Sequence, residues 1–127
     1  MATDPEGIFL LGRKRLFISS EGDTRADPPI APFVKRFRLS GRERRALPLP
    51  TRYLPGAASG RGIRFNLAFE SLTAPPGGGA LYTATEAALI QDGPAADVGR
   101  PSLARILRFD LRRGRPAAEF IYVVEPV

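Results

Sequence analysis

Two pairs of glutamates stand at matching places in the chain and are the residues best suited to chemistry. Glu6 and Glu21 flank one short apolar hairpin pattern, Glu70 and Glu86 flank a second, and the two pairs are spaced by 15 and 16 residues. In an antiparallel hairpin the start of the first strand and the end of the second lie at the same end. All four carboxylates are therefore expected on one rim. Oxygen-only ligands suit a hard cation such as Ca²⁺, so the spacing predicts a metal site, with Asp92 in the next loop as a fifth ligand.

Further side chains complete this predicted site. Glu70 and Glu86 are catalytic candidates, together with Asn66, which stands just before the second hairpin. Arg64 and Arg105 are candidates for binding a substrate phosphate through charge-assisted hydrogen bonds. The alternative is that the acids only pair with nearby arginines and fix the loops. A surface ion pair stabilises a fold by too little to explain glutamates repeated in both copies, which favours the site.

The elements that position these residues are short strands around glycine-rich turns. The second hairpin reads FESLTA (69–74) and ALYTATE (80–86) around a Pro-Pro-Gly-Gly-Gly turn, and the first pairs 7–11 with 16–20. The Gly77–Gly79 run precedes a strand, so it is a plain turn and no phosphate cradle.

The likeness between the two halves continues downstream, where residues 33–42 resemble residues 103–114. Each copy runs hairpin, polar loop, third strand, glycine turn and fourth strand, and the offset between copies is 64 to 65 residues. Internal periodicity of this kind is typical of repeat folds. The sequence predicts an all-β, β-propeller-like fold of two tandem four-stranded antiparallel blades from a larger array.

Two blades cannot close a ring, because propellers need about four to eight. Their open sheet edges invite pairing with other strands. We therefore expect either missing propeller blades in a longer protein or self-association of this chain.

Composition excludes several classes of function. With no Cys and no His, the chain has no disulfide, no thiol catalysis, no Ser-His-Asp triad and no His-ligated metal. The net charge of +6 comes from 17 Arg and two Lys. The arginine clusters lie in hairpin turns without an aromatic platform for bases, which argues against nucleic acid as the partner. No apolar run is long enough for a membrane helix, and the N-terminus shows no signal-peptide pattern.

The ordered motifs resemble a known family, the phytase-like domains described as "esterase-like activity of phytase". The likeness rests on NLAFESLTAPPGGGALYTATEAALIQDG, then RILRFDL, and on the earlier segments DPEGI and ISSEG. One departure is Ala68, where the family often has Gly, and a later acidic strand segment is absent. The resemblance covers nearly the whole chain and implies a partial phytase-like propeller domain over 1–127, with repeats at about 4–50 and 66–127. It draws attention to these positions: Glu6, Glu21, Asn66, Glu70, Glu86 and Asp92.

The resemblance also implies an extracytoplasmic location and hydrolysis of a small phosphorylated or ester substrate. Two functions stay open at this point. One is metal-assisted hydrolysis of phosphate esters. The other is a non-catalytic propeller module that binds a cation or a partner at its rim.

Overall fold

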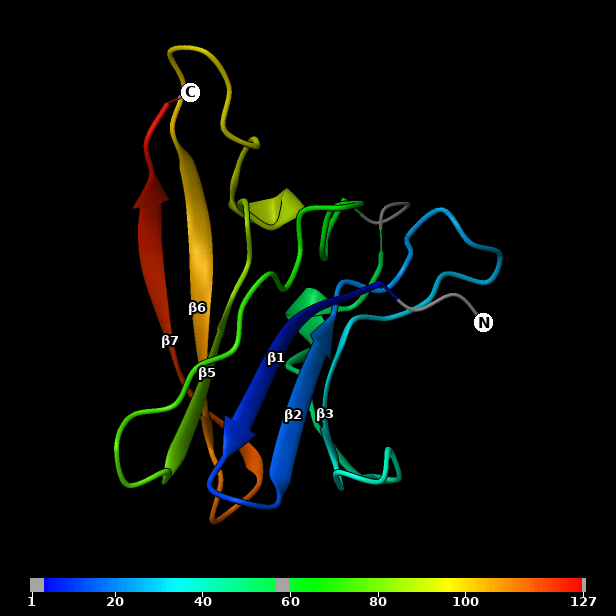
Figure 1. Cartoon of the computed structure of the whole chain (residues 1–127). Coiled ribbons are helices and arrows are strands. Elements are labelled where there is room, and N and C mark those ends of the chain that lie inside the picture. Colours follow the sequence, from blue (N-terminus) through cyan, green and yellow to red (C-terminus); the bar gives the residue numbers. More distant parts are fainter. Residues whose placement is uncertain (1–3, 57–59, 127) are drawn as a thin grey trace.

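The computed structural model describes residues 4–56 and 60–126, which form two antiparallel β-sheets (Figure 1). The first sheet has the order β1-β2-β3-β4 and contains β1 (Pro5–Leu11), β2 (Arg15–Ser20), β3 (Phe33–Phe37) and β4 (Glu43–Leu47). The second has the order β5-β6-β7 and contains β5 (Ala80–Ala84), β6 (Ser102–Asp110) and β7 (Arg115–Val124). The prediction of an all-β chain is confirmed. The described residues form no closed ring.

Two of the connections are long, residues 48–79 between β4 and β5 and residues 85–101 between β5 and β6. Among the described residues they contain the 3₁₀ turns η1 (Thr51–Tyr53) and η3 (Ile90–Asp92). Residues 57–59, in the segment that leads to the second half, lie outside the described residues, as does Val127 at the end. None of the described helical turns is long and apolar enough to cross a membrane.

The first sheet follows the sequence pattern closely. β1 and β2 pair through a turn in which Gly12 has a φ of 63°, a conformation that glycine adopts at little cost. β3 pairs with β2 along its whole length, from Leu16 opposite Phe37 to Ser20 opposite Phe33. The β1–β2 register shifts between Pro5 and Ile8, so Glu6 and Gly7 sit in an irregular stretch.

The second hairpin differs from its prediction. Residues 68–73, here called the linking segment, meet β5 and its end only at two isolated bridges, Phe69–Thr85 and Thr73–Tyr82. The segment makes no regular strand, and its other side faces the first sheet. The Ser19 hydroxyl there lies 3.5 Å from the Phe69 carbonyl, and a Cβ on Gly7 would crowd the Ser71 and Leu72 backbone. The second sheet therefore has three regular strands and not four.

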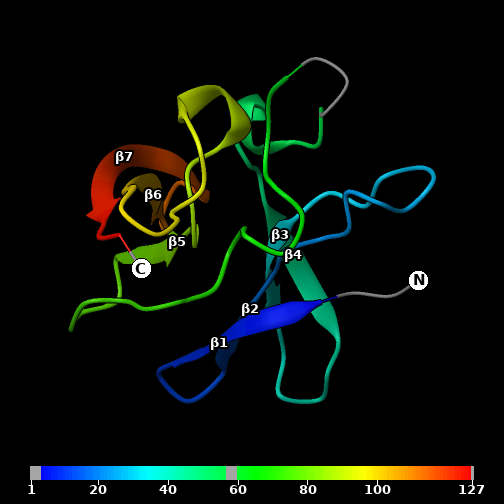
Figure 2. The ribbon, with the colours of Figure 1, turned by 90° about the horizontal axis from the view of Figure 1, so that it is seen from above.

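One hydrophobic core joins both sheets. Phe17 and Val34 of the first sheet and Leu107 of the second are almost completely buried. Between them lie Phe69 of the linking segment and Tyr53 of η1, whose rings are 5.4 Å apart. The two sheets thus share these aromatic side chains. The view from above shows the sheets side by side (Figure 2).

The hairpin turns of both sheets gather at one end of the molecule, at the bottom of Figure 1. The start of β1, the end of β2 and the end of β5 lie at the opposite end. This arrangement brings the glutamate-bearing ends of the strands together.

β7 is an edge strand with an apolar surface. It pairs only with β6, and four successive residues, Phe120, Ile121, Tyr122 and Val123, are each about half exposed. A long apolar edge with unpaired backbone groups favours pairing with another strand.

We expect the chain to self-associate through this edge. Ile121→Lys should reduce the association, because a charge on an edge strand opposes edge-to-edge pairing. Val98→Lys is the matched control, since Val98 is 83% exposed in the loop before β6 and is not part of β7. Sedimentation at several concentrations measures the effect, and a monomer at every concentration would contradict the expectation.

Candidate functional site

Five carboxylates, here called the acidic cluster, meet where the two sheets come together: Asp4, Glu6, Glu21, Glu70 and Glu86. They form two overlapping groups, one of Asp4, Glu6 and Glu21 and one of Glu21, Glu70 and Glu86. Within each group one oxygen from each residue lies within 4.8 Å of the others. The structure therefore brings together all four glutamates that the hairpin spacing placed on one rim.

Glu21 is the centre of the cluster and belongs to both groups. Its side chain is only 2% exposed, and its Oε1 accepts a hydrogen bond of 2.6 Å from the Ala68 N–H. Its own N–H donates to the Asp4 carbonyl at 3.1 Å, which holds the start of β1 beside the end of β2. The other four carboxylates lie closer to solvent.

The linking segment brings the other two glutamates to Glu21. The Glu70 N–H donates to the Ala84 carbonyl at 3.1 Å, and the Glu86 N–H donates to the Ala68 carbonyl at 2.9 Å. Ala68 thus bonds Glu21 through its N–H and Glu86 through its carbonyl. This double contact fixes the end of one hairpin against the end of the other.

The crowded carboxylates change their acidity. Burial, a side-chain hydrogen bond with Glu21 and the charges of Glu21, Glu86 and Glu6 raise the pKa of Glu70 to about 8. The pKa of Glu6 is also raised, by desolvation first and then by the charge of Asp4. Like charges this close are stable only with a shared proton or a bound cation. Both solutions fit a group of oxygen ligands without nitrogen or sulfur.

Asp92, the fifth predicted metal ligand, lies elsewhere, in an ion-pair network. Arg105 Nε and Nη2 donate to its two carboxylate oxygens at 2.5 and 2.8 Å. Arg105 also lies 3.5 Å from Glu119, which in turn pairs with Arg52 and accepts a 2.6 Å hydrogen bond from the Tyr53 hydroxyl. The Asp92 carboxylate and the Arg105 guanidinium therefore form an ion pair with two hydrogen bonds.

The network also affects the tyrosine. Burial above all raises the pKa of Tyr53 to about 12, so the hydroxyl keeps its proton and donates a hydrogen bond to Glu119. Neither Tyr53 nor Glu119 was among the residues that the motifs singled out.

The Gln-Asp-Gly triplet that contains Asp92 builds a loop. The Gln91 side chain accepts from the Gly62 N–H at 2.8 Å and donates to the Arg52 carbonyl at 3.1 Å. Gly93 has a φ of 132°, which other residues rarely adopt. The triplet therefore ties η3 to the segment around η1.

Arg64 and Asn66, two further residues of the predicted site, lie in different surroundings. Arg64 donates to the Ala88 and Gly93 carbonyls at 3.0 and 2.5 Å, so its guanidinium holds the loop after β5. Asn66 is exposed and has a φ of 54°, two residues before Ala68. Asn66 is therefore free to contact solvent, whereas the Arg64 side chain is occupied.

One residue of the acidic cluster and one arginine contact elsewhere were missed from the sequence. Asp4 joins the cluster, and its place two residues before Glu6 is a strand-like spacing that could have indicated it. The guanidinium of Arg25 stacks on the ring of Phe65, with Cζ 3.4 Å from the ring centroid. Nothing in the spacing indicates this contact, because the two loops meet only in the folded chain.

Comparison with known proteins now assigns the family. The family model "Phytase-like: Esterase-like activity of phytase" matches residues 1–127, the whole chain, which therefore belongs to the phytase-like family. No curated protein and no solved structure shows a significant match.

Two replacements of Glu21 should distinguish the effect of its hydrogen bond on stability from the effect of its charge. Glu21→Ala leaves the Ala68 N–H buried without its acceptor, so the free energy of unfolding should fall by about 1–3 kcal/mol. Glu21→Gln keeps an oxygen acceptor and removes a charge, so it should lose much less stability. Urea unfolding at neutral pH measures both, and equal losses would show that the contact with Ala68 is unimportant.

Stability should also depend on pH through Glu70. Its pKa rises from an ordinary 4.5 to about 8 on folding, so the folded chain binds more protons than the unfolded chain between these values. With a chelator present, the free energy of unfolding should therefore fall as pH rises from about 4.5 to about 8 and level off above. Urea unfolding across this range should show a flatter profile for Glu70→Gln. An unchanged profile in that variant would remove Glu70 as the cause.

Proposed function

We propose that this phytase-like chain hydrolyses phosphate esters with the help of a hard cation, Ca²⁺, held by the acidic cluster. The observation that carries the proposal is the convergence of Glu21, Glu70 and Glu86 from three separate segments, with one oxygen of each within 4.8 Å. Membership of the family supports a hydrolase-type activity.

The residues present fit such a cation. Carboxylate oxygens are the usual ligands of Ca²⁺, which accepts six to eight of them in flexible geometry. The Ala68 N–H holds the Glu21 side chain in place. Backbone hydrogen bonds fix Glu70 to Ala84 and Glu86 to Ala68. Burial first, and then the nearby negative charges, raise the pKa of Glu70, and a bound cation would offset those charges.

A cation bound there would supply positive charge that clamps and polarises a phosphoryl oxygen. Glu86 of the cluster and Asn66, two residues before Ala68, are both exposed, and we propose them as the contacts for substrate and attacking water. Arg25, on the ring of Phe65 next to Asn66, is the proposed cationic group for the phosphate, in place of the engaged Arg64 and Arg105.

The setting proposed for this activity is extracytoplasmic. Calcium modules outside the cell bind with dissociation constants of roughly 10⁻⁴ to 10⁻³ M, which a partly exposed carboxylate group can provide. The two sheets are proposed as blades of a larger propeller-like array, completed by further blades or by a second copy at the β7 edge.

One observation favours a second function, a module that binds a cation or a partner without catalysis. Arg64 and Arg105 were the arginines predicted to contact substrate, and both are hydrogen-bonded within the fold. If Arg25 does not bind the phosphate, the acidic cluster can hold the cation but none of these arginines binds the substrate. Such a module would show cation binding without turnover.

Calcium should raise the melting temperature of the chain. A ligand that binds only the folded state stabilises it by about 2.7 kcal/mol at ~100 times its dissociation constant. Glu70→Gln should lose most of this shift and stay folded, since its size is kept. Glu43→Gln is the matched control, because Glu43 pairs with Lys35 on the first sheet and takes no part in the cluster.

The same proteins separate the two functions. Hydrolysis of a chromogenic phosphate monoester should require Ca²⁺, stop with a chelator and fall in Glu70→Gln together with the thermal shift. A calcium shift without hydrolysis would favour the binding module. If Ca²⁺ shifts the melting temperature of neither the parent nor Glu70→Gln, the cation site itself is refuted.

A further inference from the structure

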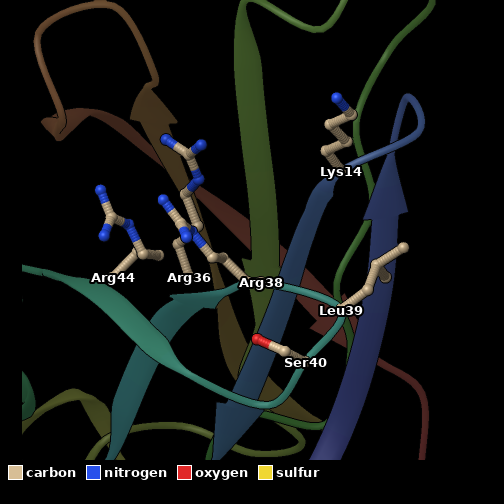
Figure 3. Close-up of a pocket in the computed structure, with 6 residues that line it drawn as sticks. All are labelled: Lys14, Arg36, Arg38, Leu39, Ser40 and Arg44. Atoms are coloured by element: carbon tan, nitrogen blue, oxygen red, sulfur yellow. The ribbon is translucent and has the colours of Figure 1, made fainter.

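A hollow lined by basic side chains lies at the end of the molecule opposite the acidic cluster. It has a volume of about 520 Å³ and is bounded by Lys14, Arg36, Arg38, Leu39, Ser40 and Arg44 (Figure 3). Three guanidinium groups gather on one side of it, and Lys14 stands across from them (Figure 3). We call it the basic hollow.

The basic hollow is separate from the acidic cluster. Lys14 lies in the β1–β2 turn, and Arg38 follows the end of β3, so both belong to the turn end of the first sheet. Glu21 follows the other end of β2, seven residues from Lys14. At about 3.3 Å per residue this places the two sites roughly 20 Å apart, too far for one phosphate group to reach both.

The four cations of the basic hollow have no acidic partner in the part of the chain that the structure describes. The acids nearest in the fold are engaged elsewhere: Glu43 pairs with Lys35 at 3.0 Å, and Asp110 lies 3.8 Å from Arg113. Arg36 is only partly exposed, and its buried Nε has no hydrogen-bond partner. A buried donor left unpaired costs stability, which a bound acceptor would recover.

A local irregularity of the sheet contributes to this gathering. The β3–β4 register shifts after Arg36, which opposes Arg45, so that Phe37 opposes Glu43 and Arg44 has no opposite residue. Bulges of this kind re-aim side chains and are frequent beside binding sites. Here the bulged Arg44 lies beside Arg36 and Arg38 (Figure 3).

We infer that the basic hollow binds a small molecule that carries two or more phosphate groups. Guanidinium groups donate paired hydrogen bonds to phosphate oxygens, and several phosphates are needed to satisfy four cations. A volume of about 520 Å³ suits a small ligand. The lining has no aromatic side chain on which a base could stack, so a small oligophosphate fits better than a nucleic acid.

Calorimetric titration of the full chain with tripolyphosphate tests the inference. A chelator is present throughout, so that a cation in the acidic cluster cannot bind the probe and the result is independent of the proposed hydrolysis. We expect saturable binding at physiological ionic strength. Arg38→Gln and Arg44→Gln should each weaken it about fivefold to tenfold through loss of charge-assisted hydrogen bonds.

Two control variants each remove one charge outside the basic hollow, a positive one in Arg61→Gln and a negative one in Glu70→Gln. Arg61→Gln changes the net charge equally on an exposed residue that does not line the hollow, and it should leave the affinity within about twofold. Glu70→Gln should also leave it unchanged. Both arginines of the test pair are exposed, so their variants should melt like the parent.

Three results would overturn the inference. Absence of binding to the parent would remove the site. Equal weakening by Arg61→Gln would reduce the effect to net charge. Displacement of tripolyphosphate by a short single-stranded oligonucleotide at lower concentration than by pyrophosphate would assign the surface to a nucleic acid.

Discussion

The structure depends on a single segment that bonds to two sheets at once. Residues 68–73 meet β5 at two bridges and carry hydrogen bonds to the first sheet at Ala68 and Phe69. Phe69 also fills the core against Tyr53. Without this segment the two sheets would share few backbone contacts. The irregular geometry of residues 68–73 thus coincides with contacts to two different sheets.

The same attachment explains why so much negative charge is concentrated in one place. The segment fixes Glu70 and Glu86 beside a Glu21 that is already buried, and the Ala68 N–H compensates only part of the cost. Burial first, and then the hydrogen bond with Glu21 and the neighbouring negative charges, raise the pKa of Glu70. A carboxylate cluster that is retained at such an energetic cost is typical of sites where the charge has a use.

The sequence predicted those features that repeat along it. The hairpin ends placed four glutamates on one rim because strand direction alone determines that geometry. It could not predict the partners of Asp92 and Arg105, since Tyr53 and Glu119 approach them only through the packing of η1 on β6 and β7. The irregular linking segment could not be predicted either. Residues 69–74 have the composition of a strand, and their contacts with Ser19 and Gly7 lie far away in the sequence.

The placement of opposite charges at the two ends of the first sheet has a consequence for how the molecule meets its surroundings. Five carboxylates at one end and unpaired arginines at the other make the chain an electric dipole aligned with the strands. Near an anionic surface such a body turns before it touches, so that its encounters are oriented and not random. The arginine end arrives first, and the carboxylates then face the open solvent.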